Sequence, residues 1–241
     1  MAIEITRETL ASGAVLEFIR QETRAMPEAG HTVLSDREIA QSLDRTLADW
    51  DGTSDVWLFG YGSLIWNPAL HYVERQIALL RGWNRRFCLW LRLGRGSLEH
   101  PGLMLALDRG DLCHGVAFRI PAAQVRTELP LLWVREMSTG LYLAQWVTIE
   151  TTEGSVRALT FTVNHRHPRY AGLLAEDEVA AVMAKAEGWL GRCADYLLST
   201  ADHLKALNLS DSYIEDLAAR VRALDGEPDG RHAADPTLPK I

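Results

Sequence analysis

Residues 57–68 read Trp-Leu-Phe-Gly-Tyr-Gly-Ser-Leu-Ile-Trp-Asn-Pro, and this stretch is the most informative in the chain. An apolar run at 56–59 has the composition of a buried strand and leads directly into Gly60-Tyr61-Gly62-Ser63. Two glycines around an aromatic residue at a strand end indicate a backbone that approaches another group closely or adopts a positive φ. The N–H groups of such a turn can bind an anion. A tight structural turn with a glycine bulge fits the same residues, so the segment alone leaves both interpretations open.

The region that follows, up to about residue 163, reads mainly as strands. Short apolar or β-branched runs between Gly, Asp and Asn turns predict strands at 56–59, 74–80, 86–93, 103–107, 115–120, 141–151 and 156–163. Hairpin-like breaks are expected at 108–111 and 153–154. One helix is expected at 121–136, with Pro121 in its first turn, and Pro130 predicts a kink or two pieces.

Helices are expected on both sides of this strand region. Residues 1–54 read as an N-terminal helical extension, in which Ser35 and Glu38 have the spacing of a capping box that opens a helix over 36–50. From residue 175 onward, apolar stripes at helical spacing predict three helices, the last with Ser212 and Glu215 as its capping box. The Gly- and Pro-rich residues 226–241 are expected to form a flexible tail. The predicted fold is α+β, a small barrel flanked by helices at both ends.

Composition narrows the classes of function. The chain has 241 residues, 47% of them hydrophobic, and a net charge of −7 without a Lys/Arg cluster, which argues against a nucleic-acid partner. Its apolar runs are too short to span a membrane, and its charged first residues do not resemble a signal peptide. Three widely spaced cysteines, Cys88, Cys113 and Cys193, form neither a disulfide framework nor a zinc set. We therefore expect a cytoplasmic protein whose cysteines are buried apolar side chains.

Two residues could carry covalent or acid–base chemistry. Ser63 would need a neighbouring base to act as a nucleophile, and the segment lacks the G-x-S-x-G elbow, which favours a hydrogen-bonding role in a ligand-binding turn. Glu136 stands among Trp133, Val134 and Met137, and burial there would raise its pKa toward the range useful for an acid or base at neutral pH. The alternative for Glu136 is a solvated carboxylate beside Arg135.

Two further segments are polar. Residues 164–170 read Asn-His-Arg-His-Pro-Arg-Tyr, and this loop either lines a polar site or lies on the surface. A metal is disfavoured because His165 and His167 have no Cys or carboxylate partner at a matching spacing. In Asn84-Arg85-Arg86-Phe87, the two arginines are either surface cations at a strand start or include one that pairs with a substrate carboxylate in bidentate fashion.

Several segments, taken in chain order, resemble one known family. They are Phe59-Gly60-Tyr61-Gly62-Ser63-Leu64-Ile65-Trp66-Asn67-Pro68, Arg85-Arg86-Phe87, Gly115-Val116-Ala117-Phe118-Arg119-Ile120-Pro121, Arg135-Glu136 with Tyr142, and Asn164 with Pro168 and Tyr170. Their order and spacing are similar to those of the ChaC-like, glutathione-specific γ-glutamylcyclotransferases. The resemblance covers roughly residues 55–225, and of these motifs Tyr-Gly-Ser-Leu-Ile-Trp is the specific one.

The resemblance implies a mostly antiparallel γ-glutamylcyclotransferase-like barrel over 55–225 and an intramolecular reaction. The α-amine of a γ-glutamyl group attacks its own γ-carbonyl, so that glutathione gives 5-oxoproline and Cys-Gly. Glu136 matches the family's general acid/base, and neither cofactor nor metal is implied. The implied substrate-binding residues are Tyr61, Gly62, Ser63, Leu64, Arg86, Tyr142, Asn164 and Tyr170.

Two other functions fit the same residues. The spacer Met-Ser-Thr-Gly-Leu between Glu136 and Tyr142 is longer than usual in the family, which would suit a cyclotransferase for another γ-glutamyl amine or dipeptide. The long helical extension would suit a non-catalytic binding module on the same fold. The oligomeric state does not follow from the sequence.

Overall fold

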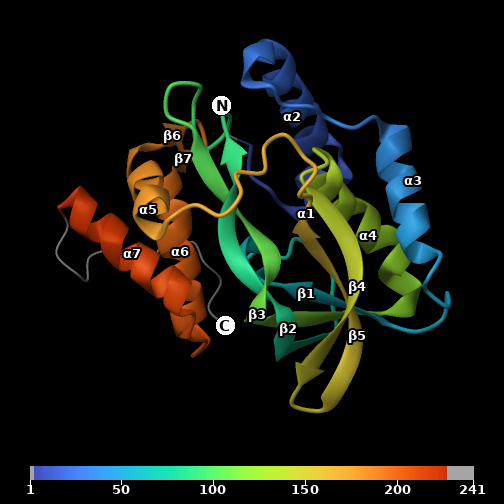
Figure 1. Ribbon diagram of the computed structural model, residues 1–241. Helices are drawn as coiled ribbons and strands as arrows, with labels where there is room; N and C mark the ends of the chain where they lie inside the picture. Colours follow the sequence, from blue (N-terminus) through green and yellow to red (C-terminus); the bar gives the residue numbers. More distant parts are fainter. Residues whose placement is uncertain (1–2, 227–241) are drawn as a thin grey trace.

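A closed β-barrel lies at the centre of the computed structural model, which describes residues 3–226 (Figure 1). Its strands are β1 Val56–Gly60, β2 Glu74–Leu91, β3 Gly102–Ile120, β4 Tyr142–Thr151 and β5 Gly154–Val163, in the spatial order β1-β3-β2-β4-β5. The β1–β3, β2–β3, β2–β4 and β4–β5 pairs are antiparallel, while β5 pairs in parallel with β1 and β3. The expected α+β fold with a mostly antiparallel barrel is therefore confirmed.

The two longest strands correct the predicted boundaries. The runs at 74–80 and 86–93 belong to one strand, β2, and those at 103–107 and 115–120 belong to β3, so the predicted break at 108–111 is wrong. The polar segment stays in the ladder because the Asn84 side chain on β2 accepts hydrogen bonds from the amides of Asp111 and Leu112, at 2.9 and 3.1 Å. Register shifts between Arg81/Trp83 and Phe87/Leu89 bend the long β2–β3 ribbon. The break at 153–154 is the β4–β5 turn, as expected.

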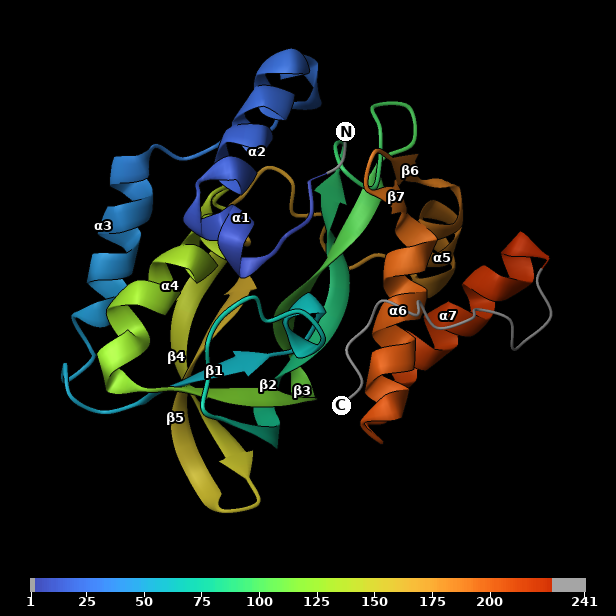
Figure 2. The same cartoon turned by 180° about the vertical axis from the view of Figure 1, so that it is seen from behind.

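The N-terminal helices cover one side of the barrel through α4 (Figure 2). They are α1 Arg7–Ala11, α2 Ala14–Ala25 and α3 Asp36–Leu47, with a 3-10 turn η1 Pro27–Ala29, and α4 is Ala122–Met137. The capping box of α3 is present: the Glu38 amide donates to Ser35 Oγ at 3.3 Å, and the Ser35 amide donates to Glu38 Oε2 at 2.8 Å. The helix ends at Leu47 instead of residue 50. The division of the chain at residues 54 and 55 stays a prediction.

Helix α4 runs through Pro130 as one element, so the expected alternative of two pieces is wrong. A proline inside a helix removes a hydrogen bond and costs about 3 kcal/mol. Burial offsets this cost, since Val125, Leu129 and Trp133 on the same helix have no exposed surface. Trp133 packs edge-to-face on Phe161 of β5 and donates from Nε1 to Ser42 Oγ of α3 at 3.1 Å. The last turn of α4, which carries Glu136, is thereby fixed between the barrel and α3.

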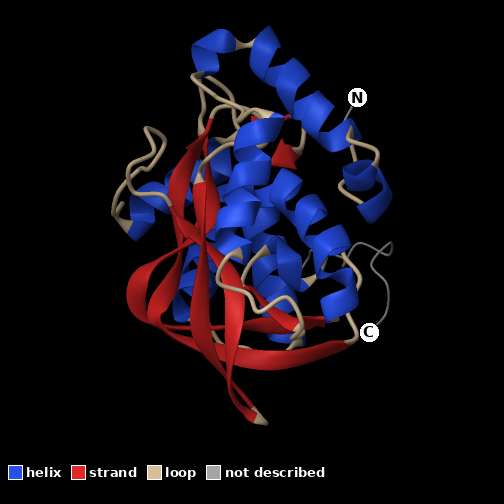
Figure 3. Cartoon of the chain, turned by 90° about the vertical axis from the view of Figure 1, so that its right-hand side faces the viewer, coloured by secondary structure: helices blue, strands red, loops and turns tan. Residues whose placement is uncertain are grey.

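The C-terminal helices form a separate layer on the other side of the barrel (Figures 1 and 2), whose strands are red in Figure 3. They are α5 Glu176–Lys185, α6 Cys193–Ala206 and α7 Ser212–Asp225, with a small hairpin of β6 Glu187–Gly188 and β7 Gly191–Arg192 between α5 and α6. The predicted capping box of α7 is wrong by one residue. Asp211 is the cap and accepts from the Ile214 amide at 3.2 Å, and Glu215 accepts instead from Ser210 Oγ and the Asp211 amide.

The described residues contain no helix that is long and apolar enough to cross a bilayer. Cys88, Cys113 and Cys193 are all buried and unbridged, and burial raises the pKa of each thiol, to about 12 for Cys88. These thiols are therefore protonated at neutral pH, as expected for apolar core residues. Of the predicted tail 226–241, residues 227–241 lie outside the described residues.

Candidate active site

The Gly-Tyr-Gly-Ser turn follows β1 and continues as a 3-10 turn, η2 Ser63–Ile65. Its two glycines serve close contact and not a positive φ, because Gly62 has φ −132° and neither residue adopts a left-handed conformation. A Cβ on Gly62 would lie 3.2 Å from the hydroxyl of Tyr196. A Cβ on Gly60 would lie 2.9 Å from the Cβ of Leu64. The structure therefore shows close approach of the backbone at these glycines, and not a positive φ.

A cluster of tyrosines surrounds this turn. Tyr61 comes from the turn, Tyr142 from the start of β4 and Tyr196 from α6, and the Tyr142 hydroxyl donates to the carbonyl of Leu105 at 2.8 Å. Burial and then the charge of Glu136 raise the pKa of Tyr61 well above its usual value and that of Tyr196 to about 12. The pKa of Tyr142 is also raised, by burial and then by Tyr61 and Glu136. All three phenols are neutral hydrogen-bond donors at physiological pH.

Glu136 lies in the last turn of α4, within electrostatic range of the three tyrosines. Its side chain is only 14% exposed, and its Oε1 lies 2.9 Å from Arg135 Nε. Burial raises the pKa of this carboxyl above the ordinary 4.5, and the neighbouring Arg135 opposes the rise. The low exposure and the raised pKa are those expected of a buried carboxylate that could act as an acid or base near neutral pH. They do not agree with the alternative of a solvated surface glutamate.

Arg135 connects the end of α4 to the turn. Its Nη2 donates to Ser63 Oγ at 2.8 Å and its Nη1 donates to the carbonyl of Asn67. Within the described part of the chain, the Ser63 hydroxyl makes no hydrogen bond to a histidine or carboxylate that could serve as its base. The geometry thus supports Ser63 as a member of a ligand-binding turn more than as a nucleophile.

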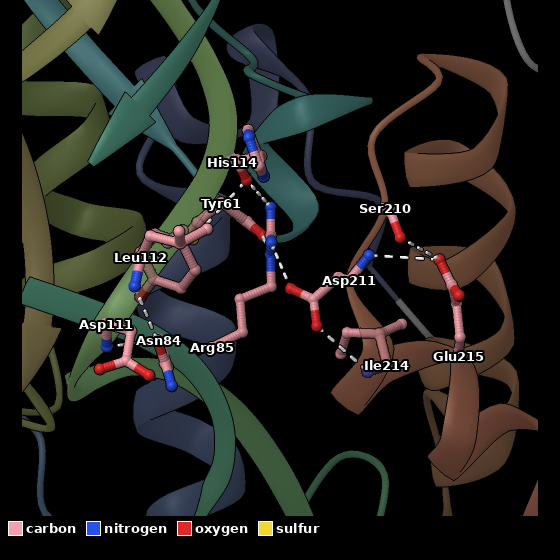
Figure 4. A network of polar contacts seen from close by, with 11 residues as sticks. Tyr61, Asn84, Arg85, Asp111, Leu112, His114, Ser210, Asp211, Ile214 and Glu215 are labelled. Atoms are coloured by element: carbon pink, nitrogen blue, oxygen red, sulfur yellow. Dashed lines mark hydrogen bonds and ion pairs between the residues drawn. The ribbon is translucent and has the colours of Figure 1, made fainter. Parts of the chain in front are cut away.

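Arg85 also contacts this turn, through the carbonyl of Tyr61 (Figure 4). Its side chain is completely buried; Nε donates to the carbonyl of Tyr61, and Nη2 donates to the carbonyl of His114 on β3. Nη1 pairs with Asp211 Oδ2 at 2.6 Å, at the start of α7. A cavity of about 550 Å³ between α6 and α7 borders Asp211, and neither Glu136 nor the turn lines it.

Arg86, Tyr170 and Asn164 take no part in the contacts described above for Glu136, Arg135 and Arg85. The Nε of Arg86 is buried and has no hydrogen-bond partner in residues 3–226. The Tyr170 hydroxyl donates to Asp108 Oδ2 at 2.9 Å. The Asn164 side chain donates to the carbonyl of Gly140 at 3.0 Å and accepts from the amide of Arg166, so it fastens the segment before β4. Substrate binding by these three residues stays a prediction.

Sequence reasoning assigned no role in the site to Arg135 or Tyr196, and it did not decide between Arg85 and Arg86. The sequence does not show which of Arg85 and Arg86 is enclosed. Adjacent residues of a strand point to opposite faces, and only the closure of the barrel decides which face is enclosed. Tyr196 reads as one more apolar position of a helical stripe. Its contact with Gly62 joins residues far apart in the chain and leaves no local signal.

Comparisons with known proteins agree with this description. The model of the family described as ChaC-like protein matches residues 56–224. A glutathione-specific γ-glutamylcyclotransferase of Escherichia coli K12 is 44% identical over 194 residues, which cover 79% of this chain and 84% of the relative. The human glutathione-specific γ-glutamylcyclotransferase 1 is 32% identical and is matched over 70% of this chain and 78% of its own.

A solved structure shares the fold. It is the crystal structure of a γ-glutamylcyclotransferase specific to glutathione from yeast, with a TM-score of 0.64 and 21% identity. The match covers 75% of this chain and the whole of the yeast chain.

Proposed function

This chain belongs to the ChaC-like family, and from that membership we propose that it is a γ-glutamylcyclotransferase that converts glutathione into 5-oxoproline and Cys-Gly. The single observation that carries the proposal is a buried carboxylate, Glu136, whose pKa is raised and which lies beside the Tyr61–Ser63 turn within the family-matched region. We also propose the cytoplasm as its location, which the composition favours.

The proposed reaction needs one acid/base group and correct folding of the substrate. The α-nitrogen attacks the γ-carbonyl carbon, a C–N bond closes the five-membered ring, and the C–N bond to cysteine breaks. Glu136 takes the proton that the attacking ammonium loses and delivers a proton to the departing amine. Because the nucleophile and the electrophile belong to one molecule, much of the proximity gain is built into the substrate.

The other residues of the site would hold the substrate. We assign Tyr61, Gly62, Ser63 and Leu64 to the γ-glutamyl end, where the backbone N–H groups of the turn would hold a carboxylate or the developing oxyanion. Arg86, whose buried Nε is unpaired, would bind a substrate carboxylate. Tyr142, Asn164 and Tyr170 complete the proposed lining. Arg135 is proposed as a positioning residue, since it ties Glu136 to Ser63.

The test is release of 5-oxoproline from glutathione by the wild-type protein and by Glu136→Gln. The substitution keeps the shape of the side chain but removes the base, and we expect a loss of kcat of at least about 100-fold. Glu150→Gln is the matched control, because Glu150 is an exposed glutamate on β4. A wild-type rate in the Glu136→Gln protein would contradict the assigned role of Glu136.

The same assay separates the alternatives. Faster turnover of another γ-glutamyl amine or dipeptide than of glutathione would reassign the substrate and keep the reaction. Binding of γ-glutamyl compounds by calorimetry without product would identify a non-catalytic module.

A further inference from the structure

Arg169 is a buried cation without an acidic partner. The residue is 6% exposed, and its Nε is enclosed without any hydrogen bond. Only Nη1 contacts a side chain, the His31 ring, at 2.8 Å from Nε2. No carboxylate in residues 3–226 forms an ion pair or hydrogen bond with this guanidinium. Burial of an unpaired charge is unfavourable, so a buried arginine without an acidic partner is suited to binding an anionic ligand.

The unused side of Arg169 is the one that binds carboxylates. A guanidinium receives a carboxylate in bidentate fashion along its Nε–Nη2 edge. Two ion pairs of this protein use that edge. Arg7 donates from Nε and Nη2 to Glu128 at 3.0 and 2.6 Å, and Arg81 does the same to Glu150 at 2.7 and 3.2 Å. On Arg169, neither Nε nor Nη2 has a hydrogen-bond partner in the described structure.

The surroundings of Arg169 favour an anion. His31 lies against it, Arg92 donates its amide toward His31 Nε2 at 3.4 Å, and His167 Nδ1 accepts from the Arg169 amide at 3.1 Å. Burial, followed by the charges of Arg169 and Arg92, lowers the pKa of His31 to about 3. Burial, with Arg92 acting in the same sense, lowers the pKa of Arg169 to about 10. At neutral pH the cluster therefore holds a charged Arg169 and a neutral His31.

The cluster borders the candidate active site on the side of Tyr142. Tyr142 is within electrostatic range of Arg169 and also of Glu136 and Tyr61. The backbone of Arg169 is fixed next to β2, since its carbonyl accepts from the Trp90 amide at 2.9 Å. The Tyr61–Leu64 turn is proposed for the γ-glutamyl end of the substrate, while Arg169 lies on the side of Tyr142. A carboxylate at the far end of the substrate would then reach Arg169.

We infer that Arg169, covered by His31 of the N-terminal helical segment, binds the glycine carboxylate of glutathione and selects leaving groups that end in a carboxylate. This inference rests on the proposed function. It gives the N-terminal segment a part in the site, since His31 precedes α3 and contacts a loop 138 residues further along the chain.

The experiment combines a substitution with a substrate analogue. Wild-type protein and Arg169→Gln are each assayed with glutathione and with glutathione whose glycine carboxylate is an amide. We expect the wild type to prefer the acid by about 10- to 100-fold in kcat/KM, the range of a charge-assisted bidentate pair. In Arg169→Gln, kcat/KM for the acid should fall by this factor, mainly through a higher KM, and kcat/KM for the amide should change little. Arg166→Gln, an exposed arginine of the same loop, should behave as the wild type.

A binding measurement makes the inference independent of turnover. Calorimetry with Cys-Gly and with its amide should show tighter binding of the acid to the wild type and no preference in Arg169→Gln, whose folding is checked by thermal denaturation. If glutathione is not a substrate, the proposed function fails while this comparison still tests Arg169.

Three results would overturn the inference. The first is equal kcat/KM of the wild type for acid and amide. The second is an equal loss on both substrates in Arg169→Gln, which would mean a structural role. The third is binding of inorganic phosphate to the wild type that Arg169→Gln abolishes, with no preference for Cys-Gly over its amide, which would assign a free anion to Arg169.

Discussion

At the scale of single residues, the burial of Glu136 that suits the role proposed for it also opposes the stability of the folded protein. The carboxyl is buried in the last turn of α4, and its pKa is raised because water is excluded from the charged form. Such a group is a better proton acceptor near neutral pH, but its ionisation opposes folding. Arg135, 2.9 Å away, reduces this opposition without removing it.

The pH dependence of stability tests this balance. In the unfolded chain Glu136 ionises near 4.5, whereas in the folded protein it keeps its proton to higher pH. The contribution of Glu136 to the stability of the wild type is therefore lost as the pH rises from about 4.5 through the folded pKa. Glu136→Gln removes this loss, so its melting temperature at pH 8 should exceed that of the wild type. Each kcal/mol gained in the free energy of unfolding should raise the melting temperature by about 2–4 °C. The difference between the two proteins should shrink toward pH 4.5.

The control is Glu150→Gln. Glu150 is exposed and its pKa is lowered in the folded protein, so this substitution should not raise the melting temperature at pH 8. Thermal denaturation at both pH values measures the difference. A melting-temperature difference for Glu136→Gln that is the same at pH 4.5 and pH 8 would contradict the account.

At the scale of elements, the Arg85–Asp211 pair joins β2, the Tyr61 turn and the start of α7 (Figure 4). Asp211 both receives Arg85 and caps α7 through the Ile214 amide. Arg85 in turn donates to the backbone of Tyr61, so the position of the turn depends on a helix about 150 residues away in sequence. This contact couples the packing of the C-terminal layer to the geometry of the site.

Asp211→Ala should therefore be strongly destabilising. It leaves a fully buried arginine without its acid and removes a helix cap, and we expect a loss of about 3–5 kcal/mol in the free energy of unfolding. Urea denaturation measures this loss. Below the melting temperature of the variant, KM for glutathione should rise because the Tyr61 carbonyl loses a fixed partner.

Glu215→Gln is the comparison, since this exposed neighbour accepts bonds from Ser210 and the Asp211 amide but does not contact Arg85. Its loss should stay within about 1 kcal/mol. Equal losses for the two variants would mean that the pair with Arg85 adds nothing beyond an ordinary helix cap.

At the scale of the whole molecule, a buried glutamate of α4 joins this helix to α1, the first of the N-terminal helices. Glu128 is 1% exposed and receives a bidentate Arg7 from α1 and the His71 amide at 3.0 Å. Burial alone would raise the pKa of Glu128, but these hydrogen bonds lower it below the ordinary 4.5. Its stabilising contribution is therefore present above about pH 4.5 and is lost as the pH falls through the folded value.

A double-mutant cycle tests this attachment. Arg7→Gln and Glu128→Gln should each lower the free energy of unfolding at pH 7, Glu128→Gln by on the order of 1–3 kcal/mol, and the double variant should lower it by less than the sum of the two. The coupling should fade as the pH falls from 4.5 through the lower pKa of the folded state, because only below that value is Glu128 protonated in both states. Chemical denaturation at pH 7 and at a series of pH values below 4.5 measures it, and strict additivity at pH 7 would show that Arg7 does not hold the extension.

Much of this protein is determined by its sequence alone. The apolar runs, the Ser35–Glu38 capping box and the glycines around Tyr61 are local patterns, and local hydrogen bonding and periodicity suffice to predict strands, a helix start and a special turn. The apolar neighbours of Glu136 indicated the direction of its pKa shift in the case of burial, but they left a solvated carboxylate beside Arg135 open, and the tertiary structure decided for burial.

Tertiary structure decided the rest. Whether 108–111 turns or continues depended on Asn84 across the ladder, and which of Arg85 and Arg86 is enclosed depended on the closure of the barrel. The contacts of Tyr196 with Gly62 and of His31 with Arg169 join segments more than 130 residues apart. The physical reason is that the burial and pairing of a polar side chain are set by its neighbours in space, and chain folding alone supplies those neighbours.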